Sequence, residues 1–140
     1  YIIDKVTMIH SLDREALCEE IQKRAEKIDR VIDCLVQVNI SKEETKHGLY
    51  KDDVVEFIKM VSEKYKNIRI RGLMTMAPFV ESVFKGLKDL SLEVESLGLE
   101  NVYMNTLSMG MSHDYHIAIK NGATIVRVGT AIFGPRNYNN

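Results

Sequence analysis

The residues best suited to chemistry lie in the last third of the chain, where glycines and small polar residues surround the ends of two predicted strands. Ser108, Gly110 and Ser112 follow an extended run and open a helical pattern. The free N–H groups and positive dipole end of a helix N-terminus favour an anion. Gly129 and Thr130 close the next strand, where a glycine lets a ligand approach the backbone. Side by side in a parallel sheet, these ends predict a phosphate site like the one that (β/α) barrels build after their last two strands.

Arg127 adds a positive charge to this region. Strand side chains alternate, so the run ATIVRVGT puts Ile125, Arg127 and Gly129 on one face and two valines on the other. A strand arginine is either a ligand contact or one half of an internal ion pair, since buried charges are normally paired. Its position two residues before a glycine of the predicted phosphate site favours the ligand.

Length and composition indicate an ordinary globular domain. The 140 residues fit one domain, and 45% hydrophobic with 28% charged residues is typical of such proteins. The net charge of −1 gives no basic field, so neither nucleic acid nor an anionic membrane is a predicted partner. No apolar run reaches the roughly 20 residues that span a bilayer.

The cysteines and histidines do not form a recognisable metal motif. Cys18 and Cys34 are too few for a disulfide framework and are predicted to be buried small hydrophobic residues. The four histidines match neither HExxH nor a Cys/His cluster, so no zinc site is predicted.

Hydrophobic periodicity predicts five strands and four helices in strict alternation. The predicted strands are 6–10, 34–40, 68–76, 102–108 and 123–130. The predicted helices are one capped by Ser11 or Asp13, one at 52–65, one from about 80 that Gly98 ends, and one at 112–121 that Gly122 ends. The first three helices carry apolar stripes expected to face the sheet: Leu17, Ile21, Ala25 and Ile28; Val54, Ile58, Val61 and Tyr65; and Val83, Leu87, Leu90, Val94 and Leu97.

The strand faces distinguish between two parallel folds. A flavodoxin-like open sheet is the simplest fold for this element order, but strands covered on both sides should be apolar throughout. In 34–40, by contrast, Leu35, Gln37 and Asn39 share one face and four apolar residues share the other. This pattern favours a barrel with helices outside and a more polar interior. Five strands cannot close a barrel of eight, so an incomplete (β/α) barrel is expected.

Five segments resemble the pyridoxal phosphate homeostasis protein family. They are IHSLDR at 9–14, QVNISKEETKHG at 37–48, RGLMTMAP at 71–78, LSMGMSHDYHIAI at 107–119 and VRVGTAIFGPR at 126–136. The last two are specific, because generic phosphate loops do not combine a methionine-flanked SMGMS with an arginine two residues before the glycine. The resemblance implies a TIM-type (β/α)8 barrel related to the N-terminal domain of alanine racemase, in the cytoplasm, with pyridoxal 5′-phosphate at the C-terminal rim.

The resemblance also implies which residues contact this cofactor. Ser112 with the backbone of Met111, and Gly129 with Thr130, would bind the phosphate, while Arg127 would face the pyridine nitrogen. A guanidinium can only donate hydrogen bonds, so it would keep that nitrogen unprotonated and make the ring a weaker electron sink. The family's Schiff-base lysine ends the first barrel strand. Strand 6–10 resembles the fourth of eight, so residues 1–140 match the C-terminal part of one barrel domain and the lysine is expected upstream.

Several weaker candidates each allow two interpretations. His10 and Asn39, near strand ends, either reach the cofactor or make hydrogen bonds at the rim. Four methionines either shape the pocket wall or fill the core: Met74, Met76, Met109 and Met111. The charged loop SKEETKHG either contacts a partner or is simply solvated.

The implied function is cofactor binding in intracellular vitamin B6 homeostasis, without clear catalytic turnover, and with PLP-dependent apoenzymes as candidate partners. One alternative is an alanine-racemase-like enzyme, which needs a second catalytic base; Tyr138, in a short tail, is a poor candidate. The other is a generic phosphate-binding barrel enzyme that acts on a phosphosugar, which predicts no bound pyridoxal phosphate.

The start of the chain carries a further expectation. The sequence begins with Tyr1 and enters a strand-like run almost at once, so an upstream segment is expected. Without it, the first strand would have an unpaired edge and the inner face would lack its opposite wall. Both features predict that residues 1–140 alone self-associate.

Overall fold

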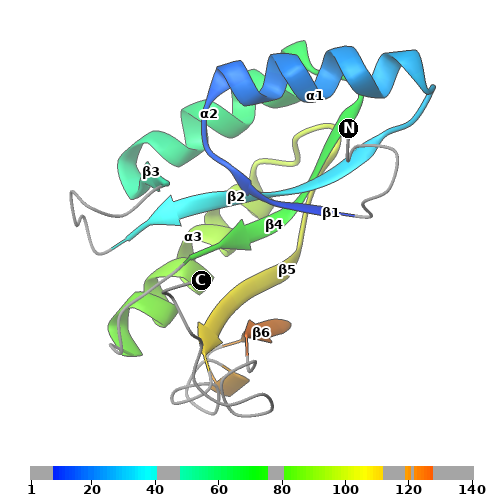
Figure 1. Cartoon of the computed structure of the whole chain (residues 1–140). Helices are drawn as coiled ribbons and strands as arrows, with labels where there is room; N and C mark the ends of the chain where they lie inside the picture. The colour runs from blue at the N-terminus through cyan, green and yellow to red at the C-terminus, as the bar shows by residue number, and fades with distance from the viewer. Residues whose placement is uncertain (1–7, 41–47, 76–80, 112–118, 121, 128–140) are drawn as a thin grey trace.

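The chain forms a parallel sheet covered by helices on one face (Figure 1). The computed structural model describes residues 8–40, 48–75, 81–111, 119–120 and 122–127. Their elements, in order, are β1 (Met8–Leu12), α1 (Glu15–Lys27), β2 (Ile32–Asn39), β3 (Leu49–Tyr50), α2 (Lys51–Lys64), β4 (Ile68–Met74), α3 (Glu81–Ser96), β5 (Val102–Met111) and β6 (Ile125–Arg127). No helix in these ranges is both long and apolar enough to cross a membrane.

The strand order confirms the barrel-type arrangement. Every pairing is parallel, and the neighbours follow the sequence in the order β1-β2-β4-β5-β6, with the two-residue β3 beside β2. A flavodoxin-like sheet reverses its strand order at a switch point, with helices on both faces. The sequential order therefore excludes that fold and leaves a partial barrel.

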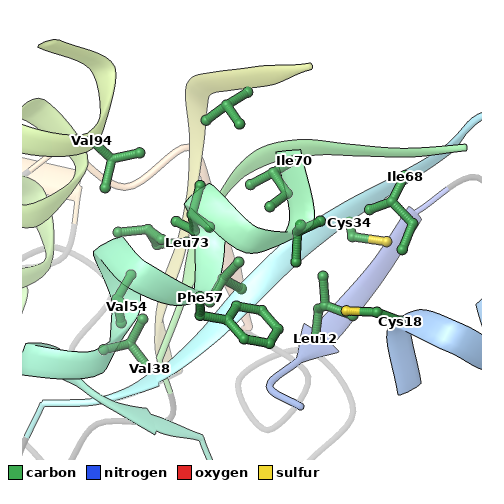
Figure 2. Packing of buried hydrophobic residues seen from close by; sticks show 14 of the residues in the cluster. Leu12, Cys18, Cys34, Val38, Val54, Phe57, Ile68, Ile70, Leu73 and Val94 are labelled. Carbon is green, nitrogen blue, oxygen red and sulfur yellow. The ribbon is translucent and has the colours of Figure 1, made fainter. Parts of the chain in front are cut away.

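The hydrophobic core lies between the helices and the outer face of the sheet. It contains every second residue of β2 from Ile32 to Val38, together with buried side chains of all three helices. In Figure 2, Cys18 of α1, Phe57 of α2 and Val94 of α3 surround strand residues such as Leu73. Side chains of alternating strand positions point to opposite faces, so the residues between these core positions belong to the inner face.

The inner face of β2 is the more polar one, as predicted. Leu35, Gln37 and Asn39 are buried but lie outside the core cluster. Asp33, on the same face, accepts a hydrogen bond at 2.6 Å from Nε of Arg69 on β4. This pair lies at the beginnings of both strands, far from the predicted rim, and the hydrogen bond raises the pKa of Arg69.

The predicted apolar stripes of the three helices are confirmed in their central residues. They are wrong at the C-terminal ends of the first and third helices. Residues of all three predicted stripes are buried: Ile21, Ala25, Val54, Ile58, Val61, Tyr65, Val83, Leu87, Leu90 and Val94. Ile28 and Leu97 are each 39% exposed. They follow the last residues of α1 and α3, where the chain leaves the helical path, so the helical spacing no longer directs them to the core.

The first predicted strand and helix start need correction. The described part of β1 is Met8–Leu12, because its pairing with β2 extends to Leu12 and Val36. Ser11 is therefore part of the strand. The N-cap of α1 is Arg14, whose side chain makes no capping hydrogen bond, so neither Ser11 nor Asp13 caps the helix. The Asp13 carboxylate instead pairs with the Arg14 guanidinium at 3.0 Å.

A polar contact links the start of α1 to the end of α2. The Glu15 carboxylate accepts hydrogen bonds from Lys64 Nζ at 2.6 Å and from the Tyr65 hydroxyl at 2.8 Å. These bonds lower the pKa of Glu15, because they favour its charged form.

The structure explains why glycine occupies two positions, 98 and 72. Gly98 follows α3 with φ of 61°, which confirms it as the helix terminator. Gly72 lies at a close approach of β4 and β5, since a Cβ there would be 1.7 Å from the Thr106 carbonyl oxygen. The register of the two strands shifts between Ile70 and Gly72, so the glycine permits a local irregularity in the sheet.

Candidate functional site

The strand ends that carry the predicted site lie along one edge of the sheet. All strands are parallel, so their C-terminal ends share that edge, which β2 reaches at Asn39, β4 at Met74, β5 at Met111 and β6 at Arg127. The arrows of β2, β4 and β5 in Figure 1 show this common direction. In parallel sheets flanked by helices, ligands bind at this edge.

The backbones of β5 and β6 are direct neighbours at this edge. Ser108 pairs with Ile125, and Met111 pairs with Arg127. Thr124 fixes the entry to β6, because its N–H donates to the Leu107 carbonyl at 2.9 Å and its Oγ1 accepts from the Leu107 N–H at 2.8 Å. The prediction that the last two strand ends lie side by side is therefore confirmed as far as Arg127.

The predicted helix start after β5 is partly wrong. Ser108 and Gly110 do not open a helix, because β5 continues to Met111. Pairing with β4 on one side and β6 on the other holds this segment extended, which the small residues of SMGMS obscured in the sequence. Ser108 is fully buried within the sheet and cannot present an N–H group at a helix N-terminus.

Three of the predicted phosphate contacts lie outside the described residues: Ser112, Gly129 and Thr130. Of the others, Met111 and Arg127 are placed by their backbones, as the paired ends of β5 and β6. The structure thus brings together the two strands that would carry the phosphate site. The contacts themselves remain predictions.

His10 and Asn39 lie on the first two strands of the sheet. Asn39 is the last residue of β2, 4% exposed, and pairs with Tyr50 of β3. His10 is half-buried in the middle of β1. Both residues make an interaction within the protein. Asn39 lies at the rim and agrees with either predicted role, a cofactor contact or a structural hydrogen bond. The prediction that His10 ends its strand is wrong, because β1 continues to Leu12.

The methionines have different surroundings. Met109 is fully buried within the hydrophobic core, so it is a core residue. Met74 is 5% exposed and lies outside that cluster. In the sheet register it lies between Gln37 of β2 and Ser108 of β5, and Ser108 in turn pairs with Ile125. These four positions form one row across the sheet just below the edge.

Sequence reasoning missed the surroundings of two polar groups near this row. Thr75 was assigned to strand 68–76, but it follows β4 and donates a hydrogen bond from Oγ1 to the Val38 carbonyl at 2.8 Å. The Ser108 hydroxyl is buried and has no hydrogen-bond partner. The strand alternation of LSM, with apolar residues on both sides of the serine, was the available signal for its inward position.

The cysteines do not add a nucleophile to the site. Cys18 and Cys34 are fully buried in the core, as predicted, and Figure 2 shows both among apolar neighbours. Burial raises the pKa of the Cys18 thiol to about 12 and also raises that of Cys34. Among the described residues, no three His, Cys, Asp or Glu side chains gather as metal ligands.

Comparison with known proteins agrees with this architecture. Residues 2–137 match the family described as alanine racemase, N-terminal domain. A protein of Aquifex aeolicus named pyridoxal phosphate homeostasis protein is 44% identical over 144 residues, covering 99% of this chain and 62% of its own length. A protein of the same name from Haemophilus influenzae is 35% identical, covering 93% of this chain and 56% of its own length. The chain thus spans about 60% of the length of these curated relatives.

Solved structures give the same result. PipY of Synechococcus elongatus, determined without PLP, superimposes with a TM-score of 0.84 at 29% identity, covering 95% of this chain and 64% of its own. The structure of PipY with PLP bound gives a TM-score of 0.82 at the same identity. On the sequence match, the strand order and the superposition together, the chain belongs to the alanine racemase N-terminal domain family.

Proposed function

We propose that the protein containing this chain binds pyridoxal 5′-phosphate and takes part in its intracellular, cytoplasmic homeostasis. The observation that carries the proposal is the parallel pairing of Met111 with Arg127, which joins two strand ends of a barrel-type sheet at its ligand-binding edge. Relatives covering most of this chain are named pyridoxal phosphate homeostasis proteins, and one similar structure, PipY, has PLP bound.

In this proposal the chain supplies the phosphate side of the site as the C-terminal part of the barrel. Ser112 and the backbone of Met111, with Gly129 and Thr130, bind the phosphate, and Arg127 donates to the pyridine nitrogen. His10 and Asn39 contact the ligand from the other strands. When bound, pyridoxal phosphate supplies a reactive aldehyde and an electron-withdrawing ring.

The described residues fit such a ligand. Gln37, Asn39 and Ser108 give the inner face buried hydrogen-bonding groups near the edge, while the outer face of the same strands is apolar. Binding sites for small molecules combine apolar walls with a few placed polar groups in this way.

In this proposal Arg127 disfavours transaminase-type chemistry, which needs a full carbanion, although an arginine at this position is compatible with a racemase as well as with a carrier. A guanidinium cannot give up its proton near neutral pH, so it leaves the ring nitrogen unprotonated and weakens the ring as an electron sink. The bound cofactor is then held for delivery, with PLP-dependent apoenzymes as recipients.

The test uses the full-length protein that contains this chain. We expect an absorbance band on addition of pyridoxal phosphate and, after borohydride reduction, a pyridoxyl adduct on a lysine upstream of residue 1. Arg127→Gln and Thr130→Ala should weaken binding, whereas the matched control Ser96→Ala, on the outer helix α3, should not. Racemisation of an amino acid by the wild-type protein would support the enzyme alternative instead, and absence of any pyridoxal phosphate binding would refute the proposal.

The 140-residue chain alone self-associates in this proposal. In the described sheet β1 has a partner on one side, β2, and a strand edge of this kind pairs readily with another chain. Sedimentation velocity should detect dimers or larger species for residues 1–140. A stable monomer with cooperative melting would contradict this part of the proposal.

A further inference from the structure

Ser108 occupies an unusual position for a hydroxyl group. It is completely buried in the middle of the sheet, on β5, between Met74 of β4 and Ile125 of β6. Its neighbours in sequence, Leu107 and Met109, both belong to the core on the helix side. Strand alternation therefore directs the Ser108 side chain to the inner face of the partial barrel.

The backbone groups around Ser108 have hydrogen-bond partners, whereas its side-chain hydroxyl has none. The Ser108 carbonyl accepts a hydrogen bond from the Thr75 N–H at 3.0 Å, and Thr124 hydrogen-bonds both backbone groups of Leu107. Other buried hydroxyls of the protein have partners, since Thr75 donates to the Val38 carbonyl at 2.8 Å and Ser62 donates to the Glu100 carbonyl at 2.7 Å. The Ser108 hydroxyl has no such partner.

Leaving a buried hydroxyl without a hydrogen bond is energetically costly, because folding removes it from water without replacement. Among the described residues, one other buried side-chain atom shares this condition, Nε of Arg71. The Arg71 guanidinium lies 5.8 Å from the centre of the Tyr103 ring, so that group has a favourable contact. Ser108 has no comparable compensation within its surroundings, and buried polar groups of this kind often serve a ligand.

The position of Ser108 relates it to the proposed site. Its strand neighbour Ile125 precedes Arg127 by two residues, a step of about 6.6 Å along a strand. Met111, whose backbone is on the proposed phosphate side, is three residues beyond Ser108 on β5 and therefore about 10 Å farther along the strand. Ser108 is thus placed below the ring side of a bound cofactor and away from its phosphate.

We infer that Ser108 is a hydrogen-bonding residue at the floor of the cofactor site, which serves the ring side of pyridoxal phosphate directly or through one ordered water. This role rests on the proposed function. Its hydroxyl is unsatisfied in the free protein and gains its hydrogen bond when the cofactor enters. The residue therefore contributes to affinity for the whole cofactor and nothing to affinity for its phosphate alone.

The experiment compares Ser108→Ala with the matched control Ser62→Ala in the full-length protein that contains this chain. Both serines are buried, but only the Ser62 hydroxyl has a partner within the fold. Calorimetric titration uses two probes, pyridoxine 5′-phosphate, which lacks the aldehyde, and inorganic phosphate. Thermal melting without ligand measures the stability of each variant.

We expect Ser108→Ala to bind pyridoxine 5′-phosphate about threefold to tenfold more weakly, to bind phosphate as the wild type does, and to melt at the same or a higher temperature. Ser62→Ala should melt lower and keep its affinity for both probes. The role of Ser108 is overturned if Ser108→Ala binds pyridoxine 5′-phosphate as tightly as the wild type, or if it loses as much stability as Ser62→Ala. Either result leaves the proposed function of the protein untouched. A wild-type protein that binds neither probe overturns the proposed function, and this role with it.

Discussion

Replacing Gly72 with alanine tests the close contact between β4 and β5. The added Cβ would lie 1.7 Å from the Thr106 carbonyl oxygen and 2.6 Å from its carbonyl carbon. The strands would have to separate by about 1.7 Å to restore 3.4 Å, where ordinary van der Waals contact begins. The obstructing atoms are backbone atoms of a paired strand, so no side-chain rotation relieves the contact.

The expected loss of stability is large. Overpacking typically costs about 1 to 3 kcal/mol where neighbours can yield. Here the separation also weakens the pairing of β4 with β5, so we expect a loss of more than about 3 kcal/mol from the total of about 5 to 15 kcal/mol typical of a domain. The same shift would displace Ser108, which lies two positions farther along β5 than Thr106.

Gly98→Ala is the matched control for this substitution. Gly98 has a left-handed conformation, with φ of 61°, but a Cβ there would have no atom within 4 Å. We expect a cost of about 1 to 2 kcal/mol from the backbone conformation alone. Urea unfolding followed by circular dichroism measures both free energies. If Gly72→Ala costs no more than Gly98→Ala, the close approach of the two strands is not real.

Three further predictions concern the core and the pH dependence. Leu87→Ala should lower the free energy of unfolding by about 2 to 5 kcal/mol, whereas Leu92→Ala, at a 55% exposed position of the same helix, should change it by less than about 1 kcal/mol; equal losses in urea unfolding would contradict the assigned helix face. Cys18 and Cys34 should not react with a thiol reagent at pH 8 until the chain unfolds, because burial raises both pKa values; rapid labelling of the native chain would refute this. The Glu15 pKa is lowered on folding, so its hydrogen bonds stabilise the protein above the ordinary value of 4.5 and this contribution is lost as the pH falls through the lowered value. The stability advantage of the wild type over Glu15→Gln should therefore shrink in acid, and an advantage that grows as the pH falls would show the sign to be wrong.

The sequence predicted the fold well where burial alone decides the spacing of apolar residues along a strand or helix. The alternation of 34–40 distinguished an outer apolar face from a more polar inner face, and both exist in β2. The stripe from Val83 to Val94 is buried for the same reason, because helical spacing repeats over several turns. Such periodic patterns predict which face is buried without any knowledge of the neighbouring elements.

The errors occur where tertiary contacts decide. A single two-residue strand such as β3 has no periodicity to detect. Ser11 and Asp13 both have side chains that commonly cap helices. Ser11 instead belongs to β1, which pairs with β2, and the Asp13 carboxylate pairs with the Arg14 guanidinium. The small residues of SMGMS suggested a helix start, whereas β4 and β6 hold them extended. Of the candidate site, the edge and its strands were predictable, but the unpartnered hydroxyl of Ser108 was not, because only coordinates show which bonds are made.

The succession of neighbours in the sheet bears on how the chain is made. From β1 to β6, each strand of the main path lies beside the one synthesised before it. During translation, every newly exposed strand and its helix can dock on a template that has already left the ribosome, without waiting for distant segments. Growth by local addition keeps loop-closure entropy small at each step.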